Sequence, residues 1–256
     1  MTTRIFFPAV GCIALLLLVV AVSATAQDAD CSADKNQFSE LHAPLSANKY
    51  DKDVEAQLTN KVESFTTSVI LRKLTAGADS NQIKDYLQCV TGRWGELSHT
   101  PVVFTGHLGA TPLAVVATVI ARDGGAVVDT KPLVQCFENS SGRWTLVGQL
   151  GDDFTGKTFD IDPLKSPVDG QLWYLLSGRT LGDTGGRLLV EVASCSQTKF
   201  ETKWKRDDFR WGKVLVTGDG TTVELSYEKL LPDGRVPVPP PPATTEVLNV
   251  TPKGLR

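Results

Sequence analysis

Residues 101–230 form a long series of short segments rich in Val, Leu, Thr and aromatic residues, and this series most constrains the fold. The segments include VVFTGHL, PLAVVATVIA, KTFDID, RLLVEVAS and TVELSYEKL, and the turn-forming groups DGG, NSSG, DTGG and GDG separate several of them. Most connections are too short for the crossovers that parallel strands need. The pattern therefore predicts an antiparallel β domain over residues 98–230.

Part of this β domain occurs twice in the sequence. The segment that begins at Pro132 aligns with the segment that begins at Leu188, at an offset of 56 residues. GDDFTGK in the first segment corresponds to RDDFRWGK in the second, and TPLAVVATV upstream aligns with GQLWYLLSG at an offset of 59. We therefore expect an internal repeat of two related four-strand meanders, residues 111–162 and 170–217. Two such units suit a sandwich-like or partial-propeller-like arrangement.

The chain before the β domain has a helical pattern, and residues 27–97 are predicted to form a short helical N-terminal region. Asp79, followed by Gln82 three positions later, predicts a capping box at the start of one helix. The preceding helix carries apolar residues at steps of three and four, namely Val54, Leu58, Val62, Phe65 and Val69. Such helices must bury their apolar faces against something larger, so the expected fold class is α+β, with the helices packed on the β domain.

Both ends of the chain differ from the middle. Residues 1–26 contain a single cation, an apolar run and the small-residue site Ala24-Thr25-Ala26, which predicts a secretory signal peptide. The alternative is an uncleaved membrane anchor. Residues 231–256 include VPVPPPP and are predicted to form a proline-rich disordered tail. We therefore expect an exported protein, periplasmic or secreted, with no membrane association after cleavage.

Four cysteines remain after the predicted signal peptide, and an even number in an exported chain favours disulfide bonds. The four residues are Cys31, Cys89, Cys136 and Cys195. Three pairings are possible. The favoured pairs are Cys31–Cys89 and Cys136–Cys195, since each then lies within one of the two regions. Free buried thiols are the alternative.

The two Asp-Asp-Phe sequences contain the candidate catalytic residues of this chain, Asp152, Asp153, Asp207 and Asp208. Paired carboxylates serve as acid and base in glycoside hydrolysis. Adjacent residues on a strand point to opposite faces, however, and the pair recurs together with Phe and Gly-Lys. We therefore favour an architectural role, in which Asp bonds to turn amides and Phe anchors the turn in the core.

Metal and cofactor motifs are missing from the sequence. Asp160, Asp162 and Asp169 lack the spacing of a calcium-binding loop, and His42 and His107 share no metal-ligand spacing with another histidine. Nucleotide-binding loops and the nucleophile elbow of lipases are also missing. The sequence therefore predicts no metal and no cofactor.

Three tryptophans are the candidate binding residues: Trp173, Trp204 and Trp211. On an exposed sheet face they would form an aromatic platform for a carbohydrate or a peptide. The alternative is that they fill the core. Trp211 has no counterpart in the first copy of the repeat, which favours exposure at that position.

These features favour an exported, non-catalytic binding or interaction protein of unknown ligand, with a carbohydrate or a protein as partner. An extracytoplasmic hydrolase that acts on a polymer through its paired aspartates is the first alternative. A structural component of the cell envelope is the second. The net charge of −3 argues against nucleic-acid binding, which needs many phosphates to be neutralised.

Overall fold

The structure, a computed structural model, describes most of the chain beyond the predicted signal peptide. The described residues are 31–45, 52–92, 101–123, 128–151, 154, 156–180, 187–231, 237–239 and 241–256. Residues 1–26, the predicted signal peptide, lie outside them. Within the described ranges, none of the helices combines the length and the apolar character needed to cross a bilayer.

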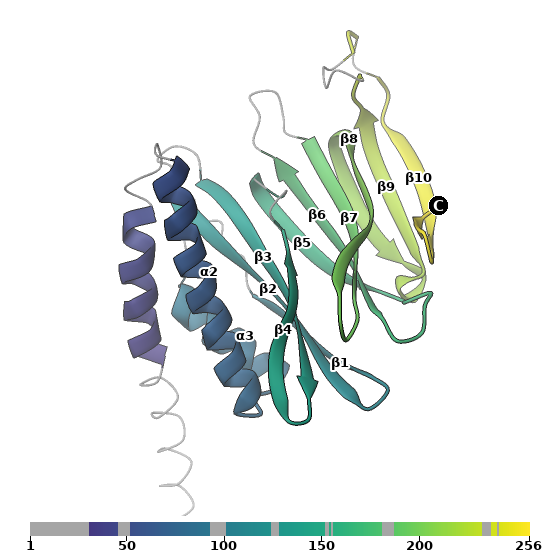
Figure 1. Ribbon diagram of the computed structural model, residues 1–256. Coiled ribbons are helices and arrows are strands. Elements are labelled where there is room, and N and C mark those ends of the chain that lie inside the picture. Colours follow the sequence, from purple (N-terminus) through teal and green to yellow (C-terminus); the bar gives the residue numbers. More distant parts are fainter. Residues whose placement is uncertain are drawn as a thin grey trace, which may run out of the picture.

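The fold is α+β, as predicted, with three N-terminal helices packed on antiparallel β-sheets (Figure 1). The helices are residues 31–45, α2 (Lys52–Thr75) and α3 (Ser80–Thr91). The first sheet contains β1 (Val102–Leu108), β2 (Thr111–Asp123), β3 (Val128–Ser140) and β4 (Arg143–Leu150), paired in that order. The second contains β5 (Gly156–Leu164), β6 (Leu172–Thr180), β7 (Arg187–Cys195), β8 (Phe200–Thr217), β9 (Thr222–Lys229), β10 (Thr244–Thr251) and β11 (Gly254–Leu255).

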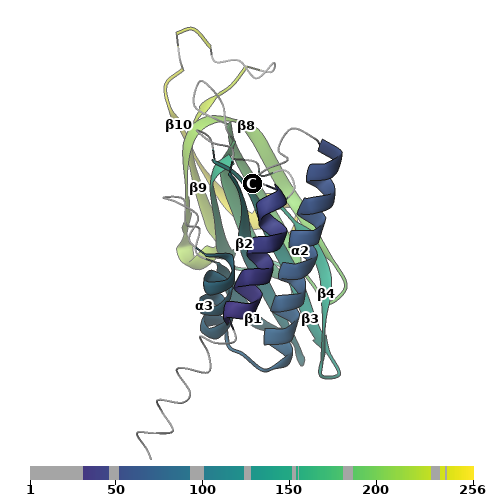
Figure 2. The ribbon, with the colours of Figure 1, turned by 90° about the vertical axis from the view of Figure 1, so that its left-hand side faces the viewer.

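The helices lie side by side over one face of the first sheet (Figure 2). The predicted capping box at α3 is confirmed, because Asp79 Oδ1 accepts from Gln82 N and Gln82 Oε1 accepts from Asp79 N, both at 2.9 Å. The predicted apolar stripe of α2 is buried at Val62 and Val69, whereas Val54 at its start is 36% exposed. Only the later turns of α2 therefore contribute fully to the core.

A chain of polar side chains fixes α2 to the sheet. The amide of Gln135 on β3 donates to Thr67 Oγ1 at 2.7 Å and to Gln149 Oε1 at 3.0 Å. Gln149 in turn donates to Glu63 Oε2 at 3.1 Å, and Lys131 forms an ion pair with Glu63 at 2.8 Å. Since Gln135 is fully buried, these bonds specify where α2 sits on the sheet.

The second sheet folds back on itself because β8 bends. The first part of β8 pairs with β7 up to Arg210, and from Phe209 onwards the strand pairs with β9. The bend passes through Gly212, where a Cβ atom would lie 2.6 Å from a Leu188 methyl group and 2.9 Å from Ser226 O. The chain then reaches the short turn Gly218–Gly220, where Gly220 O accepts from Lys165 N at 2.9 Å. Residues 214–216 in the second half of β8 and residues 159–162 of β5 then line one common groove.

Three apolar cores fill the spaces between these layers. The first lies between the helices and β2 and β3, the second between the two sheets, and the third inside the fold of the second sheet. The first contains Phe38, Val69, Leu87, Val116 and Leu133; the second contains Leu113, Cys136, Phe154, Tyr174 and Cys195; the third contains Trp173, Val190, Phe209, Leu225 and Leu255.

Both favoured disulfide pairings are confirmed: Cys31–Cys89 and Cys136–Cys195. The first ties the N-terminal helix to α3. The second joins β3 of the first sheet to β7 of the second, and both of its cysteines are fully buried in the core between the sheets. The first bond therefore joins two helices of one layer, and the second fixes one sheet to the other.

The prediction of a disordered tail over residues 231–256 is wrong for its final part. Thr244–Thr251 form β10, which pairs with β9, and the chain then turns to form β11. Tyr227 and Arg206 both bond to Glu246 on β10. The proline run predicted disorder, but TTEVLNVT after it contains β-branched residues that complete the exposed edge of β9.

The two hairpins in the predicted repeat have matching registers. Asn139 pairs with Trp144 in the first, and 56 residues later Cys195 pairs with Phe200 in the second. Both hairpins also contain a register shift. It follows Cys136 in the first hairpin and Val192 in the second, again 56 residues apart.

The predicted offset of 59 for the preceding strands is wrong by one residue. Val115 pairs with Cys136, and Leu175 pairs with Val192, so the offset between β2 and β6 is 60. Residues on both faces of β2 are buried. Because the strand lacks an alternation of apolar and polar residues, its sequence did not determine the register.

Removal of the disulfide between the sheets should strongly destabilise the fold. We expect the double substitution Cys136→Ala and Cys195→Ala to lower the free energy of unfolding by about 4 kcal/mol, the chain-entropy value for a loop of this length. Urea denaturation of the oxidised protein measures the change. Cys31→Ala with Cys89→Ala opens a loop of nearly the same length and is the matched comparison. A loss below about 1 kcal/mol would contradict this role.

Candidate functional site

Of the two candidate carboxylates of β8, Asp208 is engaged within the strand. Asp208 accepts two hydrogen bonds from the Arg206 guanidinium, at 2.9 and 3.0 Å. These bonds hold the pKa of Asp208 below its usual value, against the opposing effect of burial. Asp207 is exposed on the surface. Asp152 and Asp153 lie outside the described residues.

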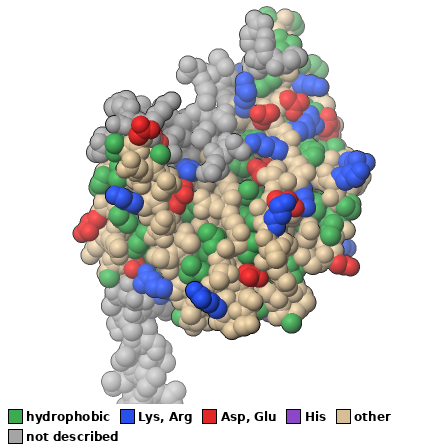
Figure 3. Space-filling model, in the orientation of Figure 1, with side chains coloured by type: hydrophobic (Ala, Val, Ile, Leu, Met, Phe, Trp, Pro, Cys, Tyr) green, Lys and Arg blue, Asp and Glu red, His purple; other side chains and the backbone are tan. Residues whose placement is uncertain are grey.

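Arg206 is the centre of a cluster that holds β10 against β8 and β9. Its guanidinium forms an ion pair with Glu246 at 3.0 Å and lies 4.2 Å from the ring centre of Phe209 and 5.5 Å from that of Tyr227. Tyr227 donates its hydroxyl hydrogen to Glu246. Acidic and basic side chains are interspersed over the β8–β10 part of the surface in Figure 3. The cluster stabilises the C-terminal strand, and its carboxylates are already paired.

Phenylalanine has the same setting in both Asp-Asp-Phe sequences. Phe154 and Phe209 are 3% and 0% exposed. Phe154 lies where the chain passes from β4 to β5, and Phe209 lies at the bend of β8. At both places the chain leaves a hairpin strand and crosses to the next layer. These positions fit the architectural interpretation of the motif.

The three candidate tryptophans do not form one surface. Trp173 is 1% exposed and donates from Nε1 to Gln171 Oε1 at 2.9 Å, so its ring fills the third core. Trp204 is half-buried and lies against Gly254, where a Cβ atom would come within 2.3 Å of the Trp204 Cβ. The side chain of Trp211 lies outside the described residues. Among the described residues, no three His, Cys, Asp or Glu side chains are grouped closely enough to hold a metal ion.

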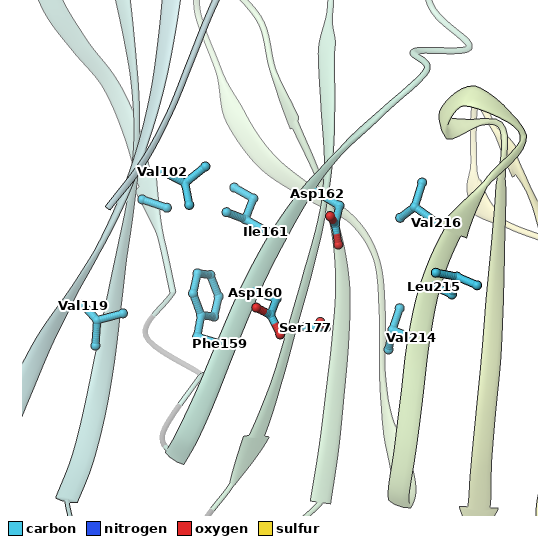
Figure 4. A pocket seen from close by; sticks show the side chains of 11 residues that line it. Val102, Val119, Phe159, Asp160, Ile161, Asp162, Ser177, Val214, Leu215 and Val216 are labelled. Atoms are coloured by element: carbon cyan, nitrogen blue, oxygen red, sulfur yellow. The ribbon is translucent and has the colours of Figure 1, made fainter. Parts of the chain in front are cut away.

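A groove of about 600 Å³ that suits a ligand runs along β5 (Figure 4). We call it the β5 groove. Its walls come from β1 and β2 of the first sheet, from β5 and β6, and from the second half of β8. The lining residues are Val102, Ala117, Val119, Phe159, Asp160, Ile161, Asp162, Ser177, Val214, Leu215 and Val216.

The strand period of β5 divides the groove into two sides. Phe159 and Ile161 point towards Val102 and Val119, and this side of the groove is apolar. Asp160 and Asp162 point to the other side, which faces β8 and contains the two carboxylates (Figure 4).

Unpaired strand edges border the groove. Residues 159–162 are consecutive and all line it, so β5 presents its backbone edge to the groove. Among the described residues, β5 pairs with β6 along its length and with β3 only at Gly156. Residues 214–216 of β8 also line the groove consecutively, and this part of β8 pairs with β9 alone within the described chain.

The carboxylate of Asp162 is electrostatically unfavourable in the groove. Burial and the neighbouring charge of Asp160 both raise the pKa of Asp162. Within the described residues, neither carboxylate has a hydrogen-bond or ion-pair partner. Lys213 lines an adjoining space of about 160 Å³ with Asp160, but forms no ion pair with it in the described chain. The groove therefore offers negative charge to a ligand.

The sequence contained a signal for this site. KTFDID was expected to be a strand, and strand alternation places Asp160 and Asp162 on one face with Phe159 and Ile161 on the other. The calcium-loop spacing that these aspartates lack gives no information on the two faces of the strand, and the open edge of β5 depends on contacts that a sequence does not show.

No protein-family model matches the chain, and neither the curated proteins nor the solved structures contain a significant match.

Replacement of Arg206 should release the C-terminal strand. Arg206→Gln removes the ion pairs with Asp208 and Glu246, and we expect the free energy of unfolding to fall by about 2 kcal/mol, since bonds to charged groups are lost at a half-buried position. Lys199→Gln breaks an exposed ion pair with Glu201 and should change stability by less than about 0.5 kcal/mol. Chemical denaturation measures both. Equal effects would contradict the role assigned to Arg206.

Because the pKa of Asp162 is raised, replacement of Asp162 should increase the stability of the protein by an amount that depends on pH. Ionised Asp162 lowers stability above its folded-state pKa, and protonation relieves this cost as the pH falls through that value. Asp162→Asn should therefore be more stable than the native protein near about pH 7, and the difference should disappear by about pH 3, where the carboxyl is protonated in both the folded and unfolded states. Thermal unfolding across this range measures the difference. A constant difference at every pH would contradict the argument.

Proposed function

We propose that this chain is a non-catalytic binding protein of an oxidising, extracytoplasmic compartment, and that the β5 groove is its binding site. The groove itself carries the proposal. It combines apolar walls with two unpaired carboxylates, which is the composition of a site for an amphipathic ligand with positive charge. The two disulfides fit an oxidising compartment, and the predicted signal peptide supports export.

A hydrolase is less well supported by the described carboxylates. A glycosidase needs two carboxyl groups on either side of the bond that it cleaves. Asp160 and Asp162 are two residues apart on one strand and therefore lie on the same wall of the groove. Asp208 is engaged by Arg206.

We also propose that the two halves of the β domain arose by duplication. The matched hairpin registers, the equivalent register shifts and the buried Phe154 and Phe209 support this proposal. In both halves, the chain leaves a hairpin strand and crosses to the next layer. On this proposal, the third apolar core is the counterpart of the second core and lies one layer further along the molecule.

Blocking the groove should abolish ligand binding without unfolding the protein. Val216 is half-buried in the groove wall, and Val216→Trp places a large side chain there. We expect the neutral apolar dye N-phenyl-naphthylamine to bind the native protein saturably, and the variant to bind it at least about tenfold more weakly. Dye fluorescence measures binding, and thermal unfolding confirms the fold.

Val247→Trp is the matched control. Val247 is 62% exposed on β10, away from the groove. This variant should bind the dye like the native protein. No saturable binding by the native protein, or equal binding by native protein and Val216→Trp, would overturn the proposed function.

A further inference from the structure

We propose that the occupant of the β5 groove is an extended peptide segment of a partner protein, which adds to β5 as a further strand and alternates apolar residues with Lys or Arg. This inference rests on the proposed function and specifies the ligand. It follows from the geometry of the strand edges, from the two unlike sides of the groove and from its charge.

The backbone of β5 supplies the first argument. In an antiparallel pair, every second residue directs its N–H and C=O groups away from its partner strand. Because β5 pairs with β6 on one edge, alternate residues between 158 and 164 direct these groups into the groove. A ligand without matching backbone groups would displace water from them and leave them unpaired, which is costly. An added strand satisfies them.

The two sides of the groove determine the side chains of the added strand. Successive side chains of a strand point to opposite faces. In a strand that extends β5, one set of side chains would contact Val102, Ala117 and Val119, and the other set would face the side that holds Asp160 and Asp162. The first set must be apolar, and the second is best cationic.

The charge of β5 also makes its open edge selective among the strands that could pair with it. Charged residues on an edge strand keep uncharged strands of other chains away. Asp160 and Asp162 do so here, and the same carboxylates attract a strand with Lys or Arg at alternate positions. The edge is therefore selective, because a cationic strand supplies a partner for the two carboxylates that the described chain does not.

The groove also limits the length of the segment. The bond between Lys165 N and Gly220 O joins β5 to the turn after β8 and closes one end. β5 is nine residues long, and its first residue pairs with Thr130 of β3. At about 3.3 Å per residue, the edge between these two points accommodates a strand of about five to seven residues.

Synthetic peptides test the inference on the full oxidised protein. The probe is the blocked peptide Lys-Val-Lys-Val-Lys-Val-Lys, and the control is its isomer Lys-Lys-Val-Val-Val-Lys-Lys, which has the same composition and charge. A third peptide has the alternating sequence with N-methyl groups on alternate residues, so that one edge of its backbone cannot pair. Titration calorimetry measures the affinities, and displacement of N-phenyl-naphthylamine reports binding in the groove.

We expect the alternating peptide to bind at least about tenfold more tightly than the isomer and to lose this advantage on N-methylation of the edge that faces β5. The double variant Asp160→Asn with Asp162→Asn should weaken binding of the alternating peptide by about tenfold or more. Asp169→Asn, in the exposed loop after β5, is the matched control and should bind normally. Amide exchange in β5 should slow when the peptide is bound.

The outcomes separate the two proposals. If the dye binds in the groove but the alternating peptide has no advantage over its isomer, or if N-methylation on either edge has no effect, strand addition is wrong and the proposed binding function stands. If the double variant Asp160→Asn with Asp162→Asn binds the alternating peptide with unchanged affinity, the cationic part of the inference is wrong. If neither dye nor peptide binds, both proposals fail.

Discussion

The contact between the two sheets is the interaction on which the rest of the structure depends. Cys136 and Cys195 join β3 to β7 inside the central core, where both are fully buried. Every other layer is positioned from this interface. The helices cover the outer face of the first sheet, and the fold of β8 brings β9 and β10 over the outer face of the second. A sheet with two apolar faces must be covered on both, and each layer here covers the next.

The open edge of β5 follows from this stacking. The chain passes from β4 to β5 and, one unit later, from the first half of β8 to its second half. Each passage places a new strand at the border of a layer. The second half of β8 is the strand after the second passage, and within the described chain neither its groove edge nor that of β5 has a partner strand. The groove is therefore a place where the architecture lacks one strand, and the proposed ligand would supply it.

The polar groups of the molecule divide into two kinds, and this division separates structure from function. Asp34, Glu63 and Glu246 have cationic or hydrogen-bonding partners that tie one element to another, and Asp208 pairs with Arg206 of its own strand. Asp160 and Asp162 have none in the described chain. Both carboxylates are exposed in the groove, where a cationic ligand could reach them and supply the missing charge.

Local patterns in the sequence determined much of this fold. The step of three and four residues predicted α2, Asp79 and Gln82 predicted the cap of α3, and the short β-rich segments predicted an antiparallel domain. Cysteine count and region predicted both disulfides. These features depend on neighbouring residues or on composition, so a sequence suffices to find them.

Tertiary structure alone decided the rest. The bend at Gly212, the burial of Trp173 and the pairing of β10 with β9 depend on residues far apart in the chain. The same holds for the β5 groove: Phe-Asp-Ile-Asp gave the two faces of a strand, but no pattern in the sequence indicated that its edge would remain open. Alternation can be recognised within one strand, whereas a free edge depends on whether another strand lies beside it in the folded protein.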